Sequence, residues 1–259
     1  MKRTGGFLAF SAILMSCTSS SSSTSSEPTD PTKCGPGPYG KVTGHLYEAT
    51  LDGTSKPKSE ATITFDLCPT KSFTTDASGS FSVSMTKNKP TVATIDHPDD
   101  IPTLLAEWQL ETDEFEANAS IIPKLFRAVI APEFNADNSV LGLGVFYPKG
   151  TFDAGVPDGG PTDPCQRSEG VTFAIPGHAE AKITYFTSPP SGQIPAPDSN
   201  ATATSTNGTA KVNGLPEDTF FEFTGSKPGC TVTGKHDGFT GRAKLQKGFA
   251  TLAFTQMTK

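Results

Sequence analysis

The sequence predicts a mainly β protein with two tandem antiparallel β-sandwich domains and one short helix in the first. Two local patterns indicate strands and turns. In "SFSVSM" the apolar residues Phe81, Val83 and Met85 alternate with serine, which is the period-two pattern of a half-buried strand. In "TNGT" the pair Asn207-Gly208 is typical of a type I′ turn between two hairpin strands. A third observation, a break in composition near the middle of the chain, divides it into two halves.

That break is the segment "KGTFDAGVPDGGPTDP", residues 149–164. It is rich in Gly, Pro and Asp, which predicts a solvated linker rather than a packed element. The first sandwich is therefore expected over residues 34–148 and the second over residues 165–259. Each half contains several short apolar runs bounded by turn residues, as in known β-sandwiches.

The first half also carries the turn and the helix that the sequence predicts. "TDASG" contains Asp76 and Gly79, two residues suited to a tight reversal. The short helix is expected over "SIIPKLFRAVIAP", residues 120–132, where Ser120 would cap the helix and Pro132 would end it. "SVLGLGVFYP" then returns as a strand.

The segments "FTTDASGSFSVSM" and "ATSTNGTAKVNGLP" resemble the carboxypeptidase regulatory-like, or transthyretin-like, β-sandwich family. That family typically shows T-D-x-x-G-x-F between two strands. The second segment departs from the pattern, with Asn207 in place of the Asp and Ala210 in place of the Phe. The resemblance implies Ig/transthyretin-like sandwiches that are mostly non-catalytic and that sometimes bind glycans or protein partners.

The N-terminus has the features of an export signal. Lys2 and Arg3 precede a short apolar run that is too short to span a bilayer, which takes about 20 residues. The run ends at Cys17, and Leu14 lies three residues before it, so the segment resembles the lipobox of bacterial lipoproteins. This implies a signal peptide over residues 1–16 and acylation of Cys17.

Residues 17–33 then form the lipid anchor and a Ser-rich tether, because the hydroxyl run has no apolar face to bury. Thr18 stands where many lipoproteins of the inner membrane carry Asp. The resemblance therefore favours the outer membrane, facing either the periplasm or the exterior. The alternative is an ordinary signal peptide in which Cys17 has no such role.

The charge and the cysteines narrow the class of protein. Two of the 21 basic residues lie in the signal segment, so 19 remain against 27 acidic residues, a formal charge of −8. That charge argues against a nucleic-acid partner. Besides Cys17 there are four cysteines, which predict two disulfides with three pairings open. We favour Cys34–Cys68 and Cys165–Cys230, because these pairs fall on either side of the linker.

The acidic stretch from Asp99 to Glu116 holds seven carboxylates, no Lys or Arg, and the only tryptophan. Ala106, Trp108 and Leu110 alternate with polar residues, which predicts a strand with one buried face. We expect this stretch to form the binding surface, with Trp108, Glu107, Glu111, Asp113 and Glu114 as its candidate residues. His97, Asp99 and Asp100 are a weaker candidate for a metal site by ligand type; we favour ordinary loop chemistry and expect no metal or cofactor.

Three functions remain open from the sequence. The leading one is a non-catalytic, lipid-anchored envelope protein that binds a glycan or a protein. The second is a structural or assembly subunit of an envelope complex. The third is a hydrolase that uses His178 or His236, but no G-x-S-x-G, H-E-x-x-H or phosphate loop accompanies these residues. We therefore expect a protein that is not an enzyme.

Overall fold

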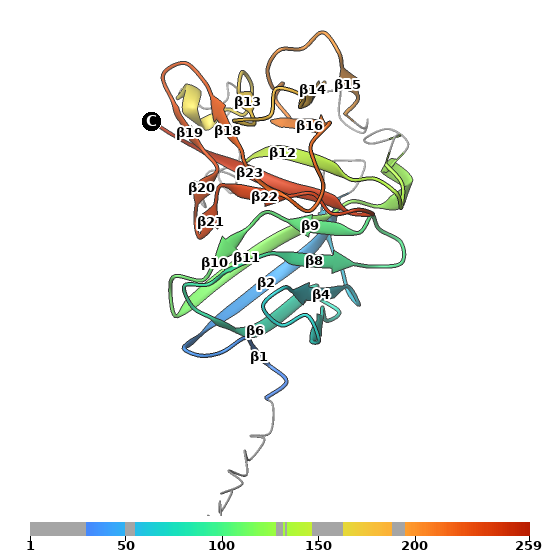
Figure 1. The fold of residues 1–259 in the computed structure, drawn as a ribbon, viewed down its shortest axis with the longest axis vertical. Coiled ribbons are helices and arrows are strands. Elements are labelled where there is room, and N and C mark those ends of the chain that lie inside the picture. Colours follow the sequence, from blue (N-terminus) through green and yellow to red (C-terminus); the bar gives the residue numbers. More distant parts are fainter. Residues whose placement is uncertain (1–29, 50–54, 128–131, 133, 147–162, 188–194) are drawn as a thin grey trace, which may run out of the picture. The chain divides into compact units, whose positions relative to one another are not determined.

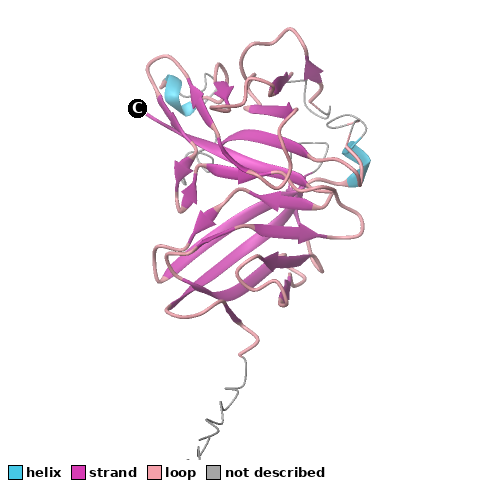
Figure 2. Ribbon diagram, viewed as in Figure 1, coloured by secondary structure: helices cyan, strands magenta, loops and turns pink. Residues whose placement is uncertain are grey.

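Strands dominate the part of the chain that the structure describes (Figure 2). This computed structural model describes residues 30–49, 55–127, 132, 134–146, 163–187 and 195–259. The predicted signal, Cys17, most of the tether and most of the linker lie outside these residues. Residues 31–259 group into one compact unit, so the mainly β class is confirmed but the division into two tandem domains is not.

The first sheet is built entirely from the N-terminal half of the chain (Figure 1). Its order is β1-β6-β2-β11, and β3 pairs with the end of β2. The bounds are β1 Lys33–Cys34, β2 Tyr39–Ala49, β3 Ser55–Pro57, β6 Ser80–Thr86 and β11 Glu114–Ile121. β11 lies parallel to β2 over its whole length and forms one edge of this sheet.

The largest sheet joins strands from both halves of the chain. Its main path is β15-β14-β16-β12-β23-β9-β8-β4-β5, and β13, β18 and β19 branch from it through β23. The bounds are β4 Thr62–Phe65, β5 Ser72–Thr74, β8 Ala93–Asp96, β9 Thr103–Leu105, β12 Val140–Phe146, β13 Thr172–Ala174, β14 Lys182–Phe186, β15 Pro197–Asp198, β16 Thr209–Asn213, β18 Thr224–Ser226, β19 Thr231–Thr233 and β23 Ala250–Thr258.

Two small sheets complete the strands of the described residues. One has the order β20-β21-β10-β7 and the other pairs β17 with β22. The bounds are β7 Pro90–Thr91, β10 Trp108–Gln109, β17 Phe220–Glu222, β20 Lys235–His236, β21 Phe239–Thr240 and β22 Arg242–Lys244. The first of these sheets brings Trp108 beside Phe239, so it too joins the two halves.

The expectation of purely antiparallel sheets is wrong. β1 with β6, β2 with β11, β12 with β23, and β9 with β23 all pair in parallel. Each of these pairs joins strands that are distant in sequence, whereas an antiparallel pair can be joined by a short hairpin. Local turn signals predict hairpins and carry no information about such distant pairs.

The buried side chains form two main clusters. One comes from residues 34–121 and includes Val42, Phe65 and Trp108. The other contains mostly C-terminal residues but also Leu141 and Leu143 of β12. Thus β12 is a strand, as expected, but it pairs with β16 and β23 instead of completing the N-terminal sandwich.

The predicted reversal at Asp76 is confirmed. The Asp76 carboxylate accepts hydrogen bonds from the backbone N–H groups of Ser78 at 2.8 Å and Ser80 at 2.9 Å. Gly79 has a φ of 74°, and a Cβ there would lie 2.5 Å from the Leu46 carbonyl oxygen. The turn therefore uses glycine both for its backbone conformation and for its close approach to β2.

The predicted type I′ turn at Asn207-Gly208 is wrong. Only Gly208 has a positive φ, 67°, whereas type I′ needs one at both central residues. Instead Gly208 donates its N–H to the Ser205 carbonyl at 2.9 Å, and the Asn207 side chain accepts from the Thr209 N–H at 3.0 Å. The Asn207 amide also donates to the Thr187 carbonyl at 2.6 Å, so this residue ties the turn to another loop.

The helix expected over residues 120–132 is replaced at its start by other structure. β11 runs through Ile121, and the 3₁₀ helix η1 covers only Lys124–Phe126. Residues 128–131 lie outside the described part. The apolar pair Ile121-Ile122 fits a helical stripe equally well, but pairing with β2 takes Ile121 into a strand, where it is fully buried.

Both favoured disulfides are confirmed. Cys34 pairs with Cys68, and Cys165 pairs with Cys230. Cys34 lies in β1, and Cys165 lies in the 3₁₀ helix η2, Pro164–Gln166. The Asp163 carboxylate caps that short helix by accepting from the Cys165 N–H at 2.9 Å. The Cys34–Cys68 bridge belongs to the buried cluster of the N-terminal half.

Candidate functional site

Trp108 forms part of the wall of a cavity in the N-terminal half. Its side chain is largely buried, with 5% of the residue exposed. The ring stacks on Phe115 of β11 at 5.8 Å between centroids and meets the edge of Phe65 at 6.2 Å. The predicted alternation is confirmed on its apolar side, because Ala106 and Leu110 are buried as well.

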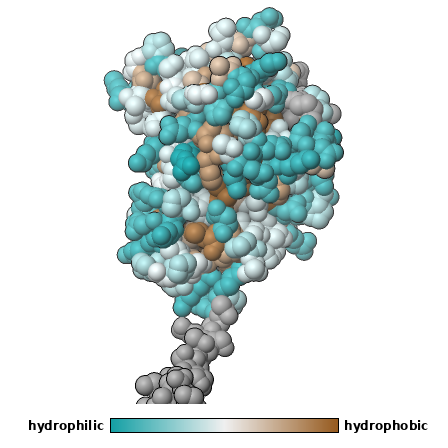
Figure 3. Space-filling model, in the orientation of Figure 1, coloured by the Kyte–Doolittle hydropathy of each residue, from teal (hydrophilic) through white to brown (hydrophobic). Residues whose placement is uncertain are grey.

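The cavity, which we name the Trp108 cavity, has a volume of about 610 Å³. Its interior is lined by apolar side chains from three of the sheets: Val42, Leu46, Ile63, Phe65, Phe81, Ile95, Leu105, Trp108 and Phe115. Figure 3 shows apolar residues in a hollow of the surface where β10 and β11 lie, bordered by hydrophilic residues. A volume of this size is typical of ligand pockets, which span about 300–1,000 Å³.

One lip of the cavity is the edge strand β11. Its inward residues Phe115, Ala117 and Ala119 are only half-buried, because the cavity opens beside them. The alternate residues Glu114 and Glu116 are exposed and also line the opening. The sequence "EFEANAS" therefore places apolar atoms in the cavity and carboxylates at its mouth, as strand alternation requires.

The other lip is the hairpin that joins β20 to β21. Asp237 and Gly238 both have positive φ, 43° and 82°, as a two-residue type I′ turn requires. His236 lies in the cavity wall, and its Nε2 is 3.1 Å from the Phe254 carbonyl oxygen. The hairpin is fixed to β10, because Gln109 donates its N–H to the Gly238 carbonyl at 2.9 Å.

The five residues predicted to form the binding surface take different positions. Trp108, Glu111 and Glu114 line the Trp108 cavity. Glu107 is buried outside it, where Arg242 approaches its carboxylate at 3.2 Å and the Thr240 hydroxyl donates to it at 2.8 Å. Glu107 thus joins β10 to the C-terminal half.

Asp113 is exposed and makes an ion pair of 2.6 Å with Lys87. The hydrogen bond and the charge of the Lys87 ammonium hold the pKa of the Asp113 carboxyl below its ordinary value. At the cavity mouth, Glu111 accepts a hydrogen bond from the Gln109 amide at 2.7 Å. Glu107 and Asp113 therefore form ion pairs with residues distant in the sequence, whereas Glu111 and Glu114 face the opening.

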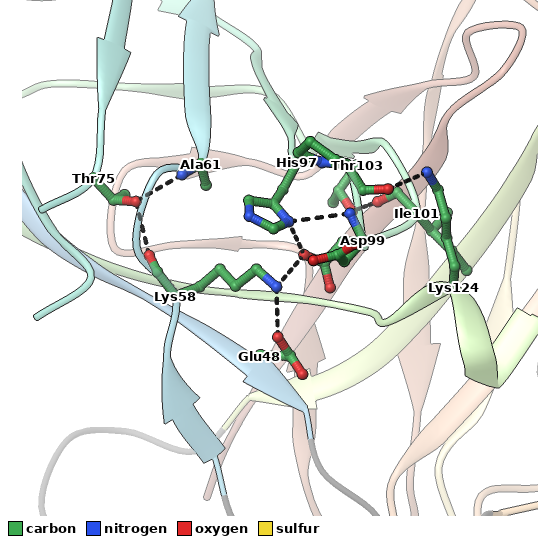
Figure 4. Close-up of polar contacts among 11 residues, drawn as sticks. Glu48, Lys58, Ala61, Thr75, His97, Asp99, Ile101, Thr103 and Lys124 are labelled. Carbon is green, nitrogen blue, oxygen red and sulfur yellow. Dashed lines mark hydrogen bonds and ion pairs between the residues drawn. The ribbon is translucent and has the colours of Figure 1, made fainter. Parts of the chain in front are cut away.

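The weaker candidate site, at His97, Asp99 and Asp100, is an ion-pair cluster. Asp100 is fully buried, and its Oδ2 lies 2.7 Å from Lys58 Nζ and 2.9 Å from His97 Nδ1. Lys58 also contacts Glu48 at 2.6 Å. Figure 4 shows the Lys58 side chain between Glu48 and the turn that carries His97 and Asp99. The ammonium of Lys58 thus occupies the position beside Asp100 that a cation would take.

Two contacts compete for one nitrogen in this cluster. His97 Nδ1 lies 3.2 Å from the Asp99 N–H and 2.9 Å from the Asp100 carboxylate. With a proton, Nδ1 can donate to the Asp100 carboxylate. Without one, Nδ1 can accept from the Asp99 N–H.

Burial lowers the pKa of Lys58, but the hydrogen bonds to Asp100 and Glu48 outweigh this effect and raise that pKa above its ordinary value. Among the described residues, no three His, Cys, Asp or Glu side chains form a group that could hold a metal ion.

The two histidines considered for hydrolysis lie far apart in the sequence and have different partners. His178 Nδ1 is 2.8 Å from the exposed carboxylate of Glu180, and this hydrogen bond lowers the pKa of Glu180. The His178 ring meets the edge of Phe221. His236, by contrast, belongs to the Trp108 cavity.

Two segments of the cavity wall were not predicted as part of the binding site, although the sequence indicates the structure of each. The alternation of "EFEANAS" indicates the strand β11, and the pair Asp237-Gly238 is a hairpin signal as strong as Asn-Gly. What the sequence does not reveal is that these two segments face each other. Among the described residues, no helix is long and apolar enough to cross a membrane.

No protein-family model matches the chain, so the resemblance to the carboxypeptidase regulatory-like sandwich is not confirmed. No curated protein matches it in sequence. Solved structures similar to it include the shaft pilin SpaA from Lactobacillus rhamnosus GG, at 9% identity and a TM-score of 0.26, covering 86% of this chain and 99% of the pilin. The minor pilin GBS52 of Streptococcus agalactiae has 12% identity and a TM-score of 0.21, covering 85% of this chain and 97% of that pilin.

The TIE protein of Bacillus anthracis has 11% identity and a TM-score of 0.25. The similarity covers 85% of this chain but only 35% of the TIE protein, so this chain spans about a third of its length. These identities and TM-scores are too low to assign the chain to a family. The functional conclusion therefore depends on the site itself.

Proposed function

We propose that this chain is a non-catalytic binding protein of the cell envelope, held to the outer membrane by acylated Cys17, and that the Trp108 cavity is its binding site. The observation that carries the proposal is the cavity of about 610 Å³, with an apolar interior and carboxylates at its mouth. Ligand sites are typically concave and mostly apolar, with a few polar groups that orient the ligand.

The cavity favours an apolar ligand over a glycan. Glycan platforms need an exposed aromatic face, but the Trp108 ring is covered by Phe115 and Phe65 and faces the cavity interior. A ligand group that enters the cavity would gain about 25 cal/mol for each Å² of apolar surface removed from water.

The proposed lipid anchor has its own test. Labelling with radioactive palmitate should mark the wild-type chain and should not mark Cys17→Ser.

The binding proposal predicts that the neutral apolar probe N-phenyl-1-naphthylamine enters the cavity and accepts excitation energy from Trp108, the only tryptophan. The protein is the full chain carrying Cys17→Ser. Ala117→Phe should abolish the signal, because the new ring fills the opening. Ala119→Leu should weaken it by the same mechanism with a smaller change in volume.

Ser72→Phe is the matched control, since Ser72 is exposed on β5 and is not part of the cavity lining. This variant should bind the probe as the wild type does. Saturable binding that survives both Ala117→Phe and Ala119→Leu, in variants that melt cooperatively, would contradict the proposal. So would the absence of energy transfer in the wild type.

A further inference from the structure

The edge of β11 beside the Trp108 cavity offers backbone groups to a partner. Lys41 of β2 donates its N–H to the Asp113 carbonyl at 2.8 Å, and β11 runs parallel to β2 from Glu114↔Lys41 onward. In a parallel ladder, alternate residues make both of their backbone hydrogen bonds to the same neighbour. Phe115, Ala117 and Ala119 therefore bond to β2.

The backbone N–H and C=O groups of the other residues of β11 point away from β2. These include Asn118 and Ser120 near the middle and end of the strand. No strand among the described residues pairs with β11 on that side. The Thr112 hydroxyl donates a hydrogen bond to the Glu114 carbonyl at 2.6 Å, and the Ile101 N–H donates one to the Ile122 carbonyl at 2.8 Å. The edge is thus closed at both ends, and between them the outward backbone groups of Asn118 and Ser120 are open to a partner.

The cavity lies directly beneath this open stretch. Phe115, Ala117 and Ala119 on β11 and the hairpin residues Asp237 and Phe239 line the same opening. A strand added to β11 would continue the alternation, so every second side chain of the new strand would point into the cavity. Apolar side chains at these positions would pack against the interior around Trp108.

The mouth selects the charge of the remaining side chains. Glu111, Glu114, Glu116 and Asp237 line it, and no Lys or Arg among the described residues does. Opposite charges on neighbouring strands attract, and like charges directly opposite one another repel. Two copies of β11 placed edge to edge would bring their glutamates together, so these charges disfavour a second copy of this chain as the partner.

We propose that the partner is an extended segment of another protein chain, in which apolar and basic residues alternate, and that it adds as a strand to the open edge of β11. Its apolar side chains fill the Trp108 cavity and its basic side chains meet the glutamates of the mouth. This mode of recognition takes affinity from main-chain hydrogen bonds and specificity from alternate side chains. The inference rests on the proposed function of the cavity and names the class of ligand.

The test uses the full chain carrying Cys17→Ser and a capped seven-residue peptide with Lys at odd positions and Val or Leu at even positions. The peptide should displace N-phenyl-1-naphthylamine and change the fluorescence of Trp108 with saturation. N-methylation of its alternate backbone amides should weaken binding by about tenfold or more, because the ladder hydrogen bonds are lost. A peptide with Glu in place of Lys should bind more weakly than the Lys peptide.

Charge reversal gives a matched pair of variants. Glu114→Lys with Glu116→Lys should reverse the preference, so that the Glu peptide now binds more tightly than the Lys peptide. Both residues are exposed, so the fold should tolerate the change. Glu222→Lys, on the exposed face of β17 and outside the cavity lining, should leave the preference unchanged.

The outcomes separate this inference from the proposed function. If the neutral probe binds and Ala117→Phe excludes it, but the Lys peptide does not compete or the N-methylated peptide binds equally well, the strand inference is wrong and the cavity binds small apolar molecules. If neither probe nor peptide binds, the proposed function is wrong as well. An unchanged preference in the charge-reversed variant would also overturn the inference.

Discussion

Replacing Lys58 with methionine is expected to lower the free energy of unfolding by about 3–5 kcal/mol, because it leaves a buried carboxylate without its cation. Asp100 is fully buried, and Lys58 Nζ lies 2.7 Å from its carboxylate. Thermal or denaturant unfolding of Lys58→Met measures the loss. For a unit of this size, the midpoint should fall by on the order of 10 °C.

Two controls distinguish the buried pair from an ordinary one. Lys87→Met removes the exposed ion pair with Asp113, which is 86% exposed, and such pairs contribute about 0.2–1 kcal/mol. The double variant Lys58→Met with Asp100→Leu removes both charges and should recover much of the loss. If Lys58→Met costs no more than Lys87→Met, the burial of this cluster does not have the energetic consequence that we infer.

Loss of the Cys165–Cys230 disulfide, in the variant Cys165→Ser with Cys230→Ser, should lower the free energy of unfolding by about 4 kcal/mol in the chain-entropy model. The bridge joins residues separated by 65 positions, so its removal frees a long loop in the unfolded chain. The Cys34–Cys68 bridge spans 34 positions and should contribute slightly less.

Denaturant titration of the two double variants checks both values. Reduction of the wild-type protein should reproduce the combined loss, which controls for effects of the serine side chains. A variant without the Cys165–Cys230 bridge that unfolds at the wild-type denaturant concentration would contradict this prediction.

Local patterns in the sequence predict much of the fold. Alternation in "SFSVSM" gives β6, and the turn chemistry of Asp76 and Gly79 gives the reversal before it, because both depend on neighbouring residues alone. The disulfide pairs follow from the position of the cysteines around one linker. The parallel pairs of β11 with β2 and of β12 with β23 depend on segments far apart in sequence, and no local pattern specifies them.

The site divides in the same way. Trp108 and its buried neighbours are visible as an alternating stretch, and Glu111 and Glu114 are visible as acidic residues beside it. The role of Glu107 is not visible, because its partner Arg242 comes from the other half of the chain. The hairpin at Asp237-Gly238 has a clear local signal, but its position across the cavity from β11 depends on the pairing of Trp108 with Phe239.

Amide hydrogen exchange along β11, followed by NMR with and without the Lys peptide, tests the binding site most directly. In the free protein, the amides of Ala117 and Ala119 should exchange slowly because they bond to β2, and those of Asn118 and Ser120 should exchange fast because they point away from it. Saturating peptide should slow the exchange of Asn118 and Ser120. Exchange at these two residues that stays unchanged while the peptide is bound would contradict the addition of a strand to β11.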